Sequence, residues 1–337
     1  MSERSKKKLQ RKRLNAPKAS QLWFEEVLGR IDGDAFGATH CAYRCNPLRC
    51  LHNGPPLTSD PVIPWDSLPQ GIHPRDGKLP QDRVRRKRHQ VENLAVFLQR
   101  LLRLHQPPSL HSHPFTHRPF FSPGDRVVEF CAGSGYVALP LACLFPHCTF
   151  VVLDKKEPSL AIAEERIAAA QLTNVEIFCG FIDDYDAPFD VGIALHACGE
   201  ATDMAMEKCV TANAAFVLAP CCVGKMKQST LAYPRSQTLQ AVLSRAEYHV
   251  LARAADFGHS SDAACKSLLE SDRTTRASER GYETFLFVMH PNNATPKNDV
   301  LVGLPPARDG RERRVLRLEC EQTLRDDERE RIMFESA

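Results

Sequence analysis

From residue 125 onward, short apolar runs alternate with stretches whose apolar residues recur at helical spacing. This alternation is typical of a parallel sheet built from strand–helix units. Seven strands are predicted, at Arg126–Phe130, Thr149–Leu153, Val175–Cys179, Val191–Leu195, Phe216–Ala219, Glu283–Met289 and Asp299–Leu304. Helices are predicted near Val137–Phe145, Pro158–Ala170, Ala201–Val210, Gln237–Ala255 and Ala263–Arg280. The pattern therefore predicts an α/β fold.

The last two predicted strands have no helix between them. Only a turn at Pro291–Lys297 separates them, so they are expected to pair antiparallel, as a hairpin. We therefore expect a seven-stranded, mostly parallel sheet that ends in a C-terminal antiparallel hairpin.

The N-terminal part of the chain has a different character. A helix is predicted over Arg85–Leu104, where apolar residues recur at helical spacing behind a basic start. Residues 46–80 contain too many prolines to sustain a helix or an interior strand, and we expect a linker that wraps around the domain. His105–Pro123 is expected to be an irregular loop, and the charged segment Arg308–Ala337 an exposed helix. We divide the chain into a disordered basic tail (1–20), a Cys/Pro-rich extension (21–84), the α/β domain (85–305) and a charged C-terminal tail (306–337).

Charge and cysteine content change this picture in two ways. The net charge of +3 splits into +7 on residues 1–18 and −4 on the rest, so a basic arm precedes a mildly acidic body. Such an arm can bind a polyanion, serve as a targeting signal or form a solvated leader. Thirteen irregularly spaced cysteines do not resemble a disulfide framework, which favours a reducing compartment. No apolar run is long enough to span a membrane, and we expect a cytoplasmic protein. The basic N-terminus leaves nuclear or mitochondrial targeting as the alternative.

A glycine turn after the first predicted strand is the strongest candidate cofactor site. The run Glu129-Phe130-Cys131-Ala132-Gly133-Ser134-Gly135 joins that strand to its helix, where backbone can approach a ligand beside the helix N-terminus. Cys131 stands where the dinucleotide fingerprint has its first glycine, so NAD is the rival cofactor and not the favoured one. We expect S-adenosylmethionine, with Glu129 accepting from the amino group of its methionine part.

Two further acids fit the same cofactor. Asp154 lies at the carboxyl end of the second predicted strand, where a carboxylate can accept both ribose hydroxyls. Asp183 or Asp184, just past the third strand, is placed to reach the adenine amino group, although a helix cap or a solvated loop acid is the alternative. The predicted cofactor residues are Glu129, Cys131, Gly133, Gly135, Asp154 and Asp183.

Two clusters at the ends of the fourth and fifth strands are candidates for the chemistry. They are Ala194-Leu195-His196-Ala197-Cys198-Gly199 and Ala219-Pro220-Cys221-Cys222-Val223-Gly224, and both should face the transferable methyl group. His196 is the candidate general base, with a structural histidine as the alternative. Cys221 and Cys222 complete the candidate catalytic set. They could shape the pocket, which we favour, form part of a thiolate or zinc arrangement, or act as a covalent nucleophile.

Other residues give weaker signals. The spacing of His40, Cys41, Cys45, Cys50 and His52 matches no common zinc finger, so no metal site is predicted there. The histidines of the His105–Pro123 loop are likewise interpreted as an insertion without a metal. The basic residues at 83 and 85–88 could track phosphates, with a solvated helix start as the alternative.

Several motifs of this sequence resemble one family. They are Pro64-Trp65, Gln90–Leu94, Val127–Gly135, Ala194–Gly199, Ala201–Met204, Pro220–Gly224, Asp272-Arg273 and Pro296–Asn298. Together they resemble the methyltransferase-like region of the glutathione S-transferase C-terminal domain-containing protein, over roughly residues 61–305. A wider methyltransferase group, some of whose members modify tRNA or are linked to ribosomal RNA, is similar more distantly.

The resemblance implies a Rossmann-like class I methyltransferase fold and an S-adenosylmethionine site at Glu129, Gly133, Gly135 and Asp154. The chain has its basic tail and Cys/Pro segment in place of the relative's glutathione-transferase-like portion, so we expect no glutathione chemistry. The leading hypothesis is a methyltransferase that acts on RNA and contacts it through the basic arm. One alternative is a methyltransferase for protein or a small molecule. The other is a catalytically silent assembly factor, which the missing Asn/Asp-Pro-Pro-Tyr motif favours; the same absence disfavours methylation of an exocyclic amine.

Overall fold

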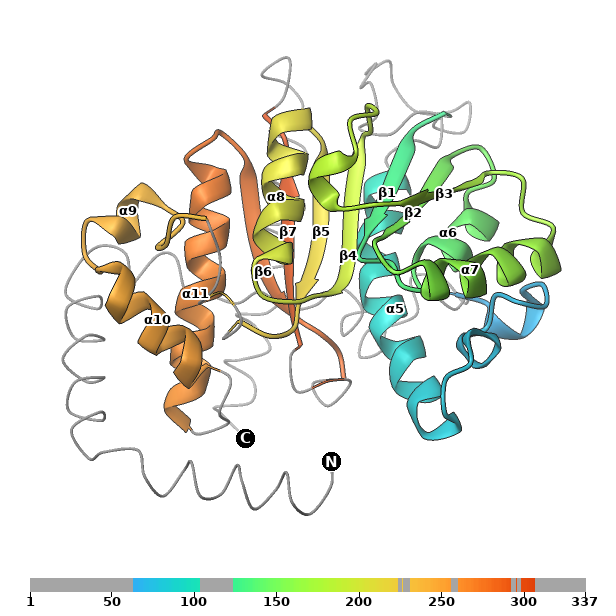
Figure 1. Ribbon diagram of the computed structural model, residues 1–337, viewed down its shortest axis with the longest axis horizontal. Helices are drawn as coiled ribbons and strands as arrows, with labels where there is room; N and C mark the ends of the chain where they lie inside the picture. Colours follow the sequence, from blue (N-terminus) through green and yellow to red (C-terminus); the bar gives the residue numbers. More distant parts are fainter. Residues whose placement is uncertain are drawn as a thin grey trace, which may run out of the picture.

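A seven-stranded sheet forms the centre of the computed structural model, which describes residues 63–103, 124–223, 226, 231–255, 260–291, 295 and 298–306. The strand order is β3-β2-β1-β4-β5-β7-β6 (Figure 1). The strands are β1 (Arg126–Phe130), β2 (Thr149–Asp154), β3 (Val175–Cys179), β4 (Val191–Ala197), β5 (Ala215–Pro220), β6 (Glu283–Val288) and β7 (Asp299–Leu304). All seven predicted strands are confirmed, with ends that shift by at most two residues.

The predicted C-terminal hairpin is also confirmed. β1 to β5 pair in parallel, whereas β7 runs antiparallel to both of its neighbours. In the hairpin, Glu283 pairs with Leu304 and Val288 with Asp299. β7 inserts between β5 and β6, so the later strand of the hairpin is the inner one.

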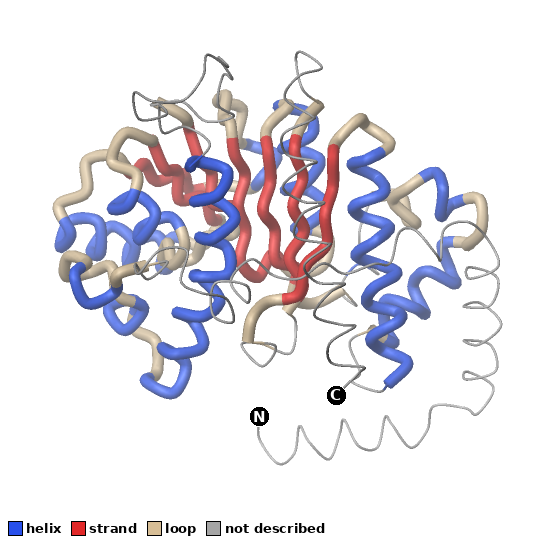
Figure 2. Tube along the Cα trace, turned by 180° about the vertical axis from the view of Figure 1, so that it is seen from behind, coloured by secondary structure: helices blue, strands red, loops and turns tan. Residues whose placement is uncertain are grey.

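Helices cover both faces of the sheet (Figures 1 and 2). One face packs against α5 (Gln81–Arg103), α6 (Ala138–Leu144) and α7 (Glu157–Ala170), and the other against α8 (Ala201–Ala212) and α11 (Ser260–Ser278). Successive strand residues point to opposite faces, so Val127 joins the first core and Val128 the second. Strands that are apolar on both faces are therefore buried on both sides, as the sequence pattern predicted.

One helix prediction is wrong in its extent. The single helix predicted over Gln237–Ala255 is two helices, α9 (Gln237–Gln240) and α10 (Arg245–Ala254). The break occurs because Ser244 forms a capping box at the start of α10: its Oγ accepts from the Glu247 backbone N–H at 3.3 Å, and Glu247 Oε2 accepts from the Ser244 N–H at 2.8 Å. The remaining predicted helices within the described residues are confirmed, with ends that shift by at most four residues.

The Pro-rich segment that precedes α5 packs against the sheet domain. It contains two 3₁₀ turns, η1 (Trp65–Ser67) and η2 (Pro74–Gly77), and buries Ile63, Trp65 and Ile72 in the first core. The Arg166 guanidinium of α7 donates to the carbonyls of Gly71 (2.7 Å) and Ile72 (2.9 Å) and to that of Ser134 in the glycine turn. This segment is thus fixed beside the predicted cofactor turn.

The predictions for residues 1–20, His105–Pro123 and Arg308–Ala337 lie outside the described residues, as do those for Cys41, Cys45 and Cys50. Of the helices that the structure describes, none combines the length and apolar character needed to cross a bilayer.

The β5–β7 pairing depends on a close approach that only glycine allows. Gly303 lies opposite Phe216, and a Cβ atom at Gly303 would lie 2.1 Å from that ring. We expect Gly303→Ala to lower the free energy of unfolding by about 1–3 kcal/mol, because the ring must move. Urea denaturation measures the loss. In the double variant Phe216→Leu/Gly303→Ala the loss should be smaller than the sum of the two single losses, and simple additivity would contradict the proposed contact.

Candidate active site at the carboxyl ends of the strands

The glycine turn after β1 leaves open space in front of its backbone. Cys131, Gly133 and Gly135 have positive φ angles of 54°, 58° and 72°. A Cβ atom added at Gly133 would meet no atom within 4 Å, whereas one at Gly135 would lie 3.0 Å from the Leu139 side chain. Gly133 therefore leaves room for a ligand, and Gly135 leaves room for α6. Cys131 holds a left-handed conformation that is costly for a residue with a side chain, as is common at functional sites.

Asp154 organises this turn from the end of β2. Its Oδ2 accepts from the Gly133 backbone N–H at 2.8 Å, and its Oδ1 accepts from the Lys156 N–H at 3.0 Å. A carboxylate has about four acceptor positions, so two remain for a ligand such as a ribose diol. This geometry suits the predicted role of Asp154, beside the open space at Gly133.

Glu129 is engaged differently from what we predicted. Its side chain is buried, and its carboxylate accepts from the backbone N–H groups of Ala138 (2.7 Å) and Val137 (3.4 Å) at the start of α6. Burial raises the pKa of Glu129 to about 7, although these two backbone donors act in the opposite direction. The acid thus fixes α6 against the glycine turn, and its contact with the cofactor stays a prediction.

The predicted adenine side of the site lies beyond β3. Asp183 is exposed in the 3₁₀ turn η3 (Ile182–Asp184), and its backbone carbonyl accepts from Lys208 Nζ at 3.1 Å. Asp184 caps the same turn, because its Oδ2 accepts from the Phe181 N–H at 2.9 Å. Phe181 has 57% of its surface exposed beside these acids. Sequence reasoning missed this aromatic ring; its only signal was an apolar residue among polar loop residues.

His196 lies in a bulge at the end of β4, with a positive φ of 71°. Its Nε2 lies 2.9 Å from Gln90 Oε1 of α5, so Nε2 carries the proton in this pair. Burial and, to a lesser degree, the nearby Lys87 ammonium lower the pKa of His196 to about 4. The imidazole is therefore neutral at pH 7. It is a weaker base than the near-neutral histidine that we predicted.

Three cysteines converge where β4 and β5 end. Ala197 and Pro220 are paired in the sheet, so Cys198 and Cys221 follow them side by side. The sulfur atoms of Cys198, Cys221 and Cys222 all lie within 4.8 Å of one another, and Cys198 Sγ is 2.7 Å from Cys221 Sγ. The hydrogen bond with Cys198 and burial raise the pKa of the Cys221 thiol far above its ordinary value, which argues against a free thiolate nucleophile.

α5 contributes a lysine that sequence reasoning assigned to phosphate contacts alone. Burial lowers the pKa of Lys87 to about 8, and the charges of Glu129 and Cys221 act in the opposite direction. Its Nζ lies 5.3 Å from the centre of the ring of Tyr136, the residue that directly follows the glycine turn. Lys87 thus lies between the predicted cofactor residues and the cysteines.

Comparison with known proteins agrees with this arrangement. Residues 86–229 match the family model of a methyltransferase domain. The match covers β1 to β5, the glycine turn, Asp154, His196 and the three cysteines. The Rossmann-like fold predicted from the sequence is confirmed, and the match agrees with S-adenosylmethionine as the cofactor.

Curated relatives extend the similarity beyond residues 86–229. The chain is 35% identical over 255 residues to the glutathione S-transferase C-terminal domain-containing protein homolog of Drosophila pseudoobscura pseudoobscura, and 33% identical over 257 residues to the corresponding Homo sapiens protein. Each alignment covers 72% of this chain but only 40% and 37%, respectively, of the relative. The predicted resemblance is thus confirmed. The chain matches about two fifths of these relatives' length.

Among solved structures, the chain is similar to a fibrillarin pre-rRNA processing protein of Methanococcus jannaschii, with 7% identity and a TM-score of 0.37 over 57% of this chain and 71% of that one. A complex of P. horikoshii TYW2 with MeSAdo has 13% identity and a TM-score of 0.33, over 54% of this chain and 56% of that one.

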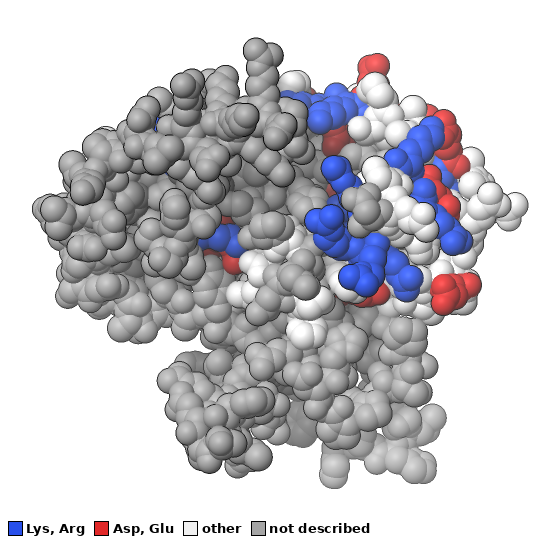
Figure 3. Space-filling model, turned by 90° about the horizontal axis from the view of Figure 1, so that it is seen from below, with Lys and Arg blue, Asp and Glu red and all other residues white. Residues whose placement is uncertain are grey.

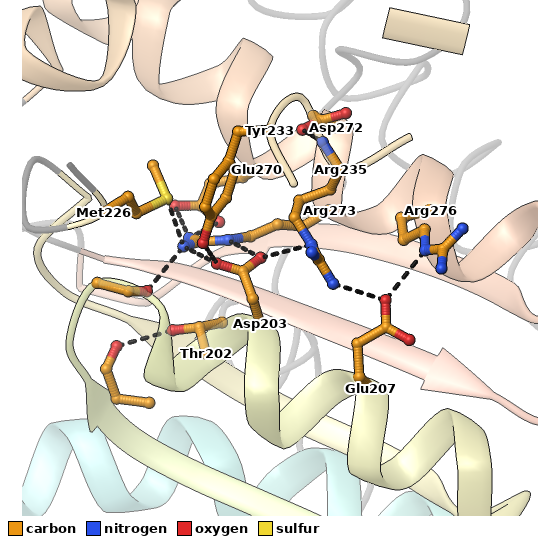
Figure 4. Close-up of polar contacts among 12 residues, drawn as sticks. Thr202, Asp203, Glu207, Met226, Tyr233, Arg235, Glu270, Asp272, Arg273 and Arg276 are labelled. Atoms are coloured by element: carbon orange, nitrogen blue, oxygen red, sulfur yellow. Dashed lines mark hydrogen bonds and ion pairs between the residues drawn. The ribbon is translucent and has the colours of Figure 1, made fainter. Parts of the chain in front are cut away.

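A buried ionic network joins α8, α11 and the loop after β4 (Figure 4). The fully buried Arg273 of α11 donates Nε and Nη2 to the Asp203 carboxylate of α8, each at 3.1 Å. Its Nη1 donates to Glu270 at 2.9 Å, and its Nη2 also donates to the Gly199 carbonyl at 3.0 Å. Gly199 is in the loop that carries Cys198, and its N–H donates to the Cys222 carbonyl at 2.6 Å. Arg273 therefore fixes both cysteine loops.

Sequence reasoning quoted Asp203 and Asp272-Arg273 as motif residues but gave them no role. The available signal was an Arg and an Asp inside an otherwise amphipathic helix. Asp272 accepts from the backbone N–H groups of Arg235 (2.7 Å) and Ser236 (2.8 Å). Asp272 therefore holds the segment before α9, whereas its neighbour Arg273 holds the loop after β4.

Removing Arg273 should take the bound guanidinium away from the buried Glu270 and leave the buried Asp203 with the Tyr233 hydroxyl at 2.8 Å and the Arg235 guanidinium at 3.7 Å. We expect Arg273→Leu to lower the free energy of unfolding by about 3–5 kcal/mol, the usual cost of breaking a buried ion pair. Denaturant titration measures this change. The matched control is Lys78→Met, which breaks the exposed 2.8 Å pair with Glu165 and should cost less than about 1 kcal/mol. Equal losses in the two variants would show that the Arg273 network is not a stability determinant.

Proposed function

We propose that this chain is an S-adenosylmethionine-dependent methyltransferase whose acceptor is RNA. The observation that carries the first part is the pairing of Asp154 with the open glycine turn: a strand-end carboxylate with free acceptor positions lies beside a backbone that leaves room for a ligand. When bound, S-adenosylmethionine supplies an electrophilic methyl group. Asp154 would bind its ribose hydroxyls, and Asp183 and Phe181 would border its adenine.

The acceptor would approach the ends of β4 and β5. His196 presents its unprotonated Nδ1, because Nε2 donates to Gln90, and Cys198, Cys221 and Cys222 line the same edge. Lys87 would face the acceptor beside Glu129. These groups can position an acceptor atom, and the neutral imidazole can take a proton weakly.

Basic residues beside this edge favour RNA as the acceptor. Arg83, Arg85 and Arg86 are exposed on the first turns of α5, the helix that also carries Lys87 and Gln90 into the site. Lys and Arg side chains gather on this face of the molecule (Figure 3). The basic arm of residues 1–18 adds a charge of +7. A 65-residue stretch is also 34% identical to ribosomal RNA small subunit methyltransferase G of Chlorobium chlorochromatii, over 19% of this chain and 28% of that protein.

A catalytically silent assembly factor is the second candidate, and one observation favours it. The low pKa of His196 makes it a weak base at neutral pH. Such a factor would bind the cofactor and RNA without transferring the methyl group, whereas a methyltransferase for protein or a small molecule would transfer it elsewhere.

The cofactor assignment predicts a specific loss in Asp154→Ala. Removing this carboxylate should weaken S-adenosylmethionine binding by about 1.5–3 kcal/mol, the range for hydrogen bonds to a charged group. Isothermal titration calorimetry measures the affinity. Asp186→Ala is the matched control, because Asp186 is exposed and pairs with Lys208. The S-adenosylmethionine affinity of this variant should not change. An unchanged affinity in Asp154→Ala, or heat with NAD alone, would refute the assignment.

The acceptor assignment predicts where a labelled methyl group goes. With radiolabelled cofactor and fractionated cell extract, label should enter RNA. Deleting residues 1–20 should weaken RNA binding about equally across sequences and flatten its salt dependence, because each neutralised phosphate releases counterions.

Filter binding at several salt concentrations compares full-length and truncated chains, and cofactor affinity serves as the internal control because it should not change. Label in protein or small molecules would reject RNA as the acceptor. Cofactor and RNA binding with no label transferred would favour the assembly factor. If RNA binding by the two chains depends equally on salt concentration, the basic arm does not contact RNA and is a targeting signal or a solvated leader.

A further inference from the structure

We infer that Cys198, Cys221 and Cys222 bind one zinc ion through three thiolates. This inference concerns the cysteine edge alone, and it does not require the methyltransferase activity proposed above. The sequence alone leaves a zinc arrangement at Cys221 and Cys222 as one of three alternatives. The structure adds Cys198 as a third possible ligand.

The backbone holds the three thiols together before any ion binds. Cys198 and Cys221 each follow one member of the paired residues Ala197 and Pro220, so the sheet register sets their separation. The 2.6 Å hydrogen bond from Gly199 N–H to the Cys222 carbonyl joins the two loops. Thr202 Oγ1 donates to the Ala197 carbonyl at 2.7 Å, and Arg273 holds the Gly199 carbonyl at 3.0 Å. Such support around the ligands is typical of metal sites.

The distances suit one ion and not a larger cluster. A Zn–S bond is about 2.3 Å, so two thiolates on a tetrahedral zinc ion lie about 3.8 Å apart. All three sulfurs here lie within 4.8 Å of one another. The 2.7 Å separation of Cys198 and Cys221 is shorter than the zinc value, so binding would move these two sulfurs apart by about 1 Å.

Three protein ligands at the edge of the sheet indicate a zinc site with an open coordination position. Catalytic zinc sites have three protein ligands and leave a fourth position for water or substrate, whereas structural sites have four. Three soft thiolates favour zinc over magnesium or calcium. The cysteines are only half-buried, at the sheet edge where an acceptor would lie. The fourth position is therefore available to water or to an acceptor atom.

Charge in the neighbourhood supports the same ligand set. Three thiolates and one zinc ion carry a net charge of −1, and Lys87 lies close enough to Cys221 to interact with it electrostatically. A cation beside a negatively charged metal centre offsets part of its burial cost. The rival interpretation is a redox pair in which Cys198 and Cys221 lose two electrons and two protons to an oxidant and form a disulfide. That chemistry gives Cys222 no role.

The test measures metal binding by the reduced full-length chain, without cofactor. Because Cys41, Cys45 and Cys50 could bind zinc themselves, the background is Cys41→Ser/Cys45→Ser/Cys50→Ser. We expect about one equivalent of zinc by elemental analysis and thiolate-to-metal charge-transfer absorption when Co²⁺ replaces it. Adding Cys222→Ser should weaken binding at least 100-fold, beyond the roughly 10–100-fold effect typical of residues that only support ligands. Cys222→His should restore binding, because histidine is also a zinc ligand.

Cys143→Ser is the matched control, since Cys143 is also half-buried but lies on α6, away from the cluster. It should bind zinc like the background chain. Circular dichroism confirms that each variant is folded. Zinc bound equally by the background chain and Cys222→Ser would overturn the inference, and so would preference for a different metal. A Cys198–Cys221 disulfide without metal binding after reduction would establish the redox pair instead. Because cofactor binding is measured separately, failure of zinc binding leaves the proposed methyltransferase function standing.

Discussion

The contact between Arg273 and Asp203 joins the parts of the molecule that make up the chemical edge of the site. Both side chains are fully buried, and each would be costly there without its partner. Arg273 comes from α11, Asp203 from the first turn of α8, and the Gly199 carbonyl that Arg273 also binds comes from the loop after β4. A single guanidinium can link these three elements because its donors form a planar fork.

This network explains why the loops after β4 and β5 have a defined geometry. Loops at strand ends are usually the most variable part of an α/β fold, because few contacts restrain them. Here Arg273 holds Gly199, and Gly199 in turn holds Cys222. The cysteines and His196 therefore lie on a rigid support, which is what positioning of an acceptor or of a metal ion requires.

The two halves of the site are built by different means. The cofactor half is mostly backbone, with the glycine turn ordered by Asp154 and α6 held by Glu129. The chemical half consists of side chains from β4, β5 and α5, a helix that precedes the sheet in the sequence. α5 is fixed in place by Asn93, whose side chain donates to the His290 carbonyl at 2.6 Å and accepts from the His290 N–H at 2.8 Å. Residues near the two ends of the domain thereby meet at one edge.

The sequence by itself determined the strands, most helices and the cofactor turn, because each depends on local patterns. Apolar runs, helical periodicity and the spacing from Gly135 to Asp154 act over a few residues or one strand–helix unit. The break before α10 was missed although its capping box was present at Ser244 and Glu247. Only the tertiary structure decided that β7 lies between β5 and β6, that Glu129 faces α6, and that His196 is buried beside Gln90. It also brought Cys198 to Cys221 and Cys222, and Arg273 to Asp203, over separations of 23 and 70 residues. Such contacts depend on strand register and on burial, and burial also sets the pKa values of Glu129 and His196; no local pattern encodes these properties.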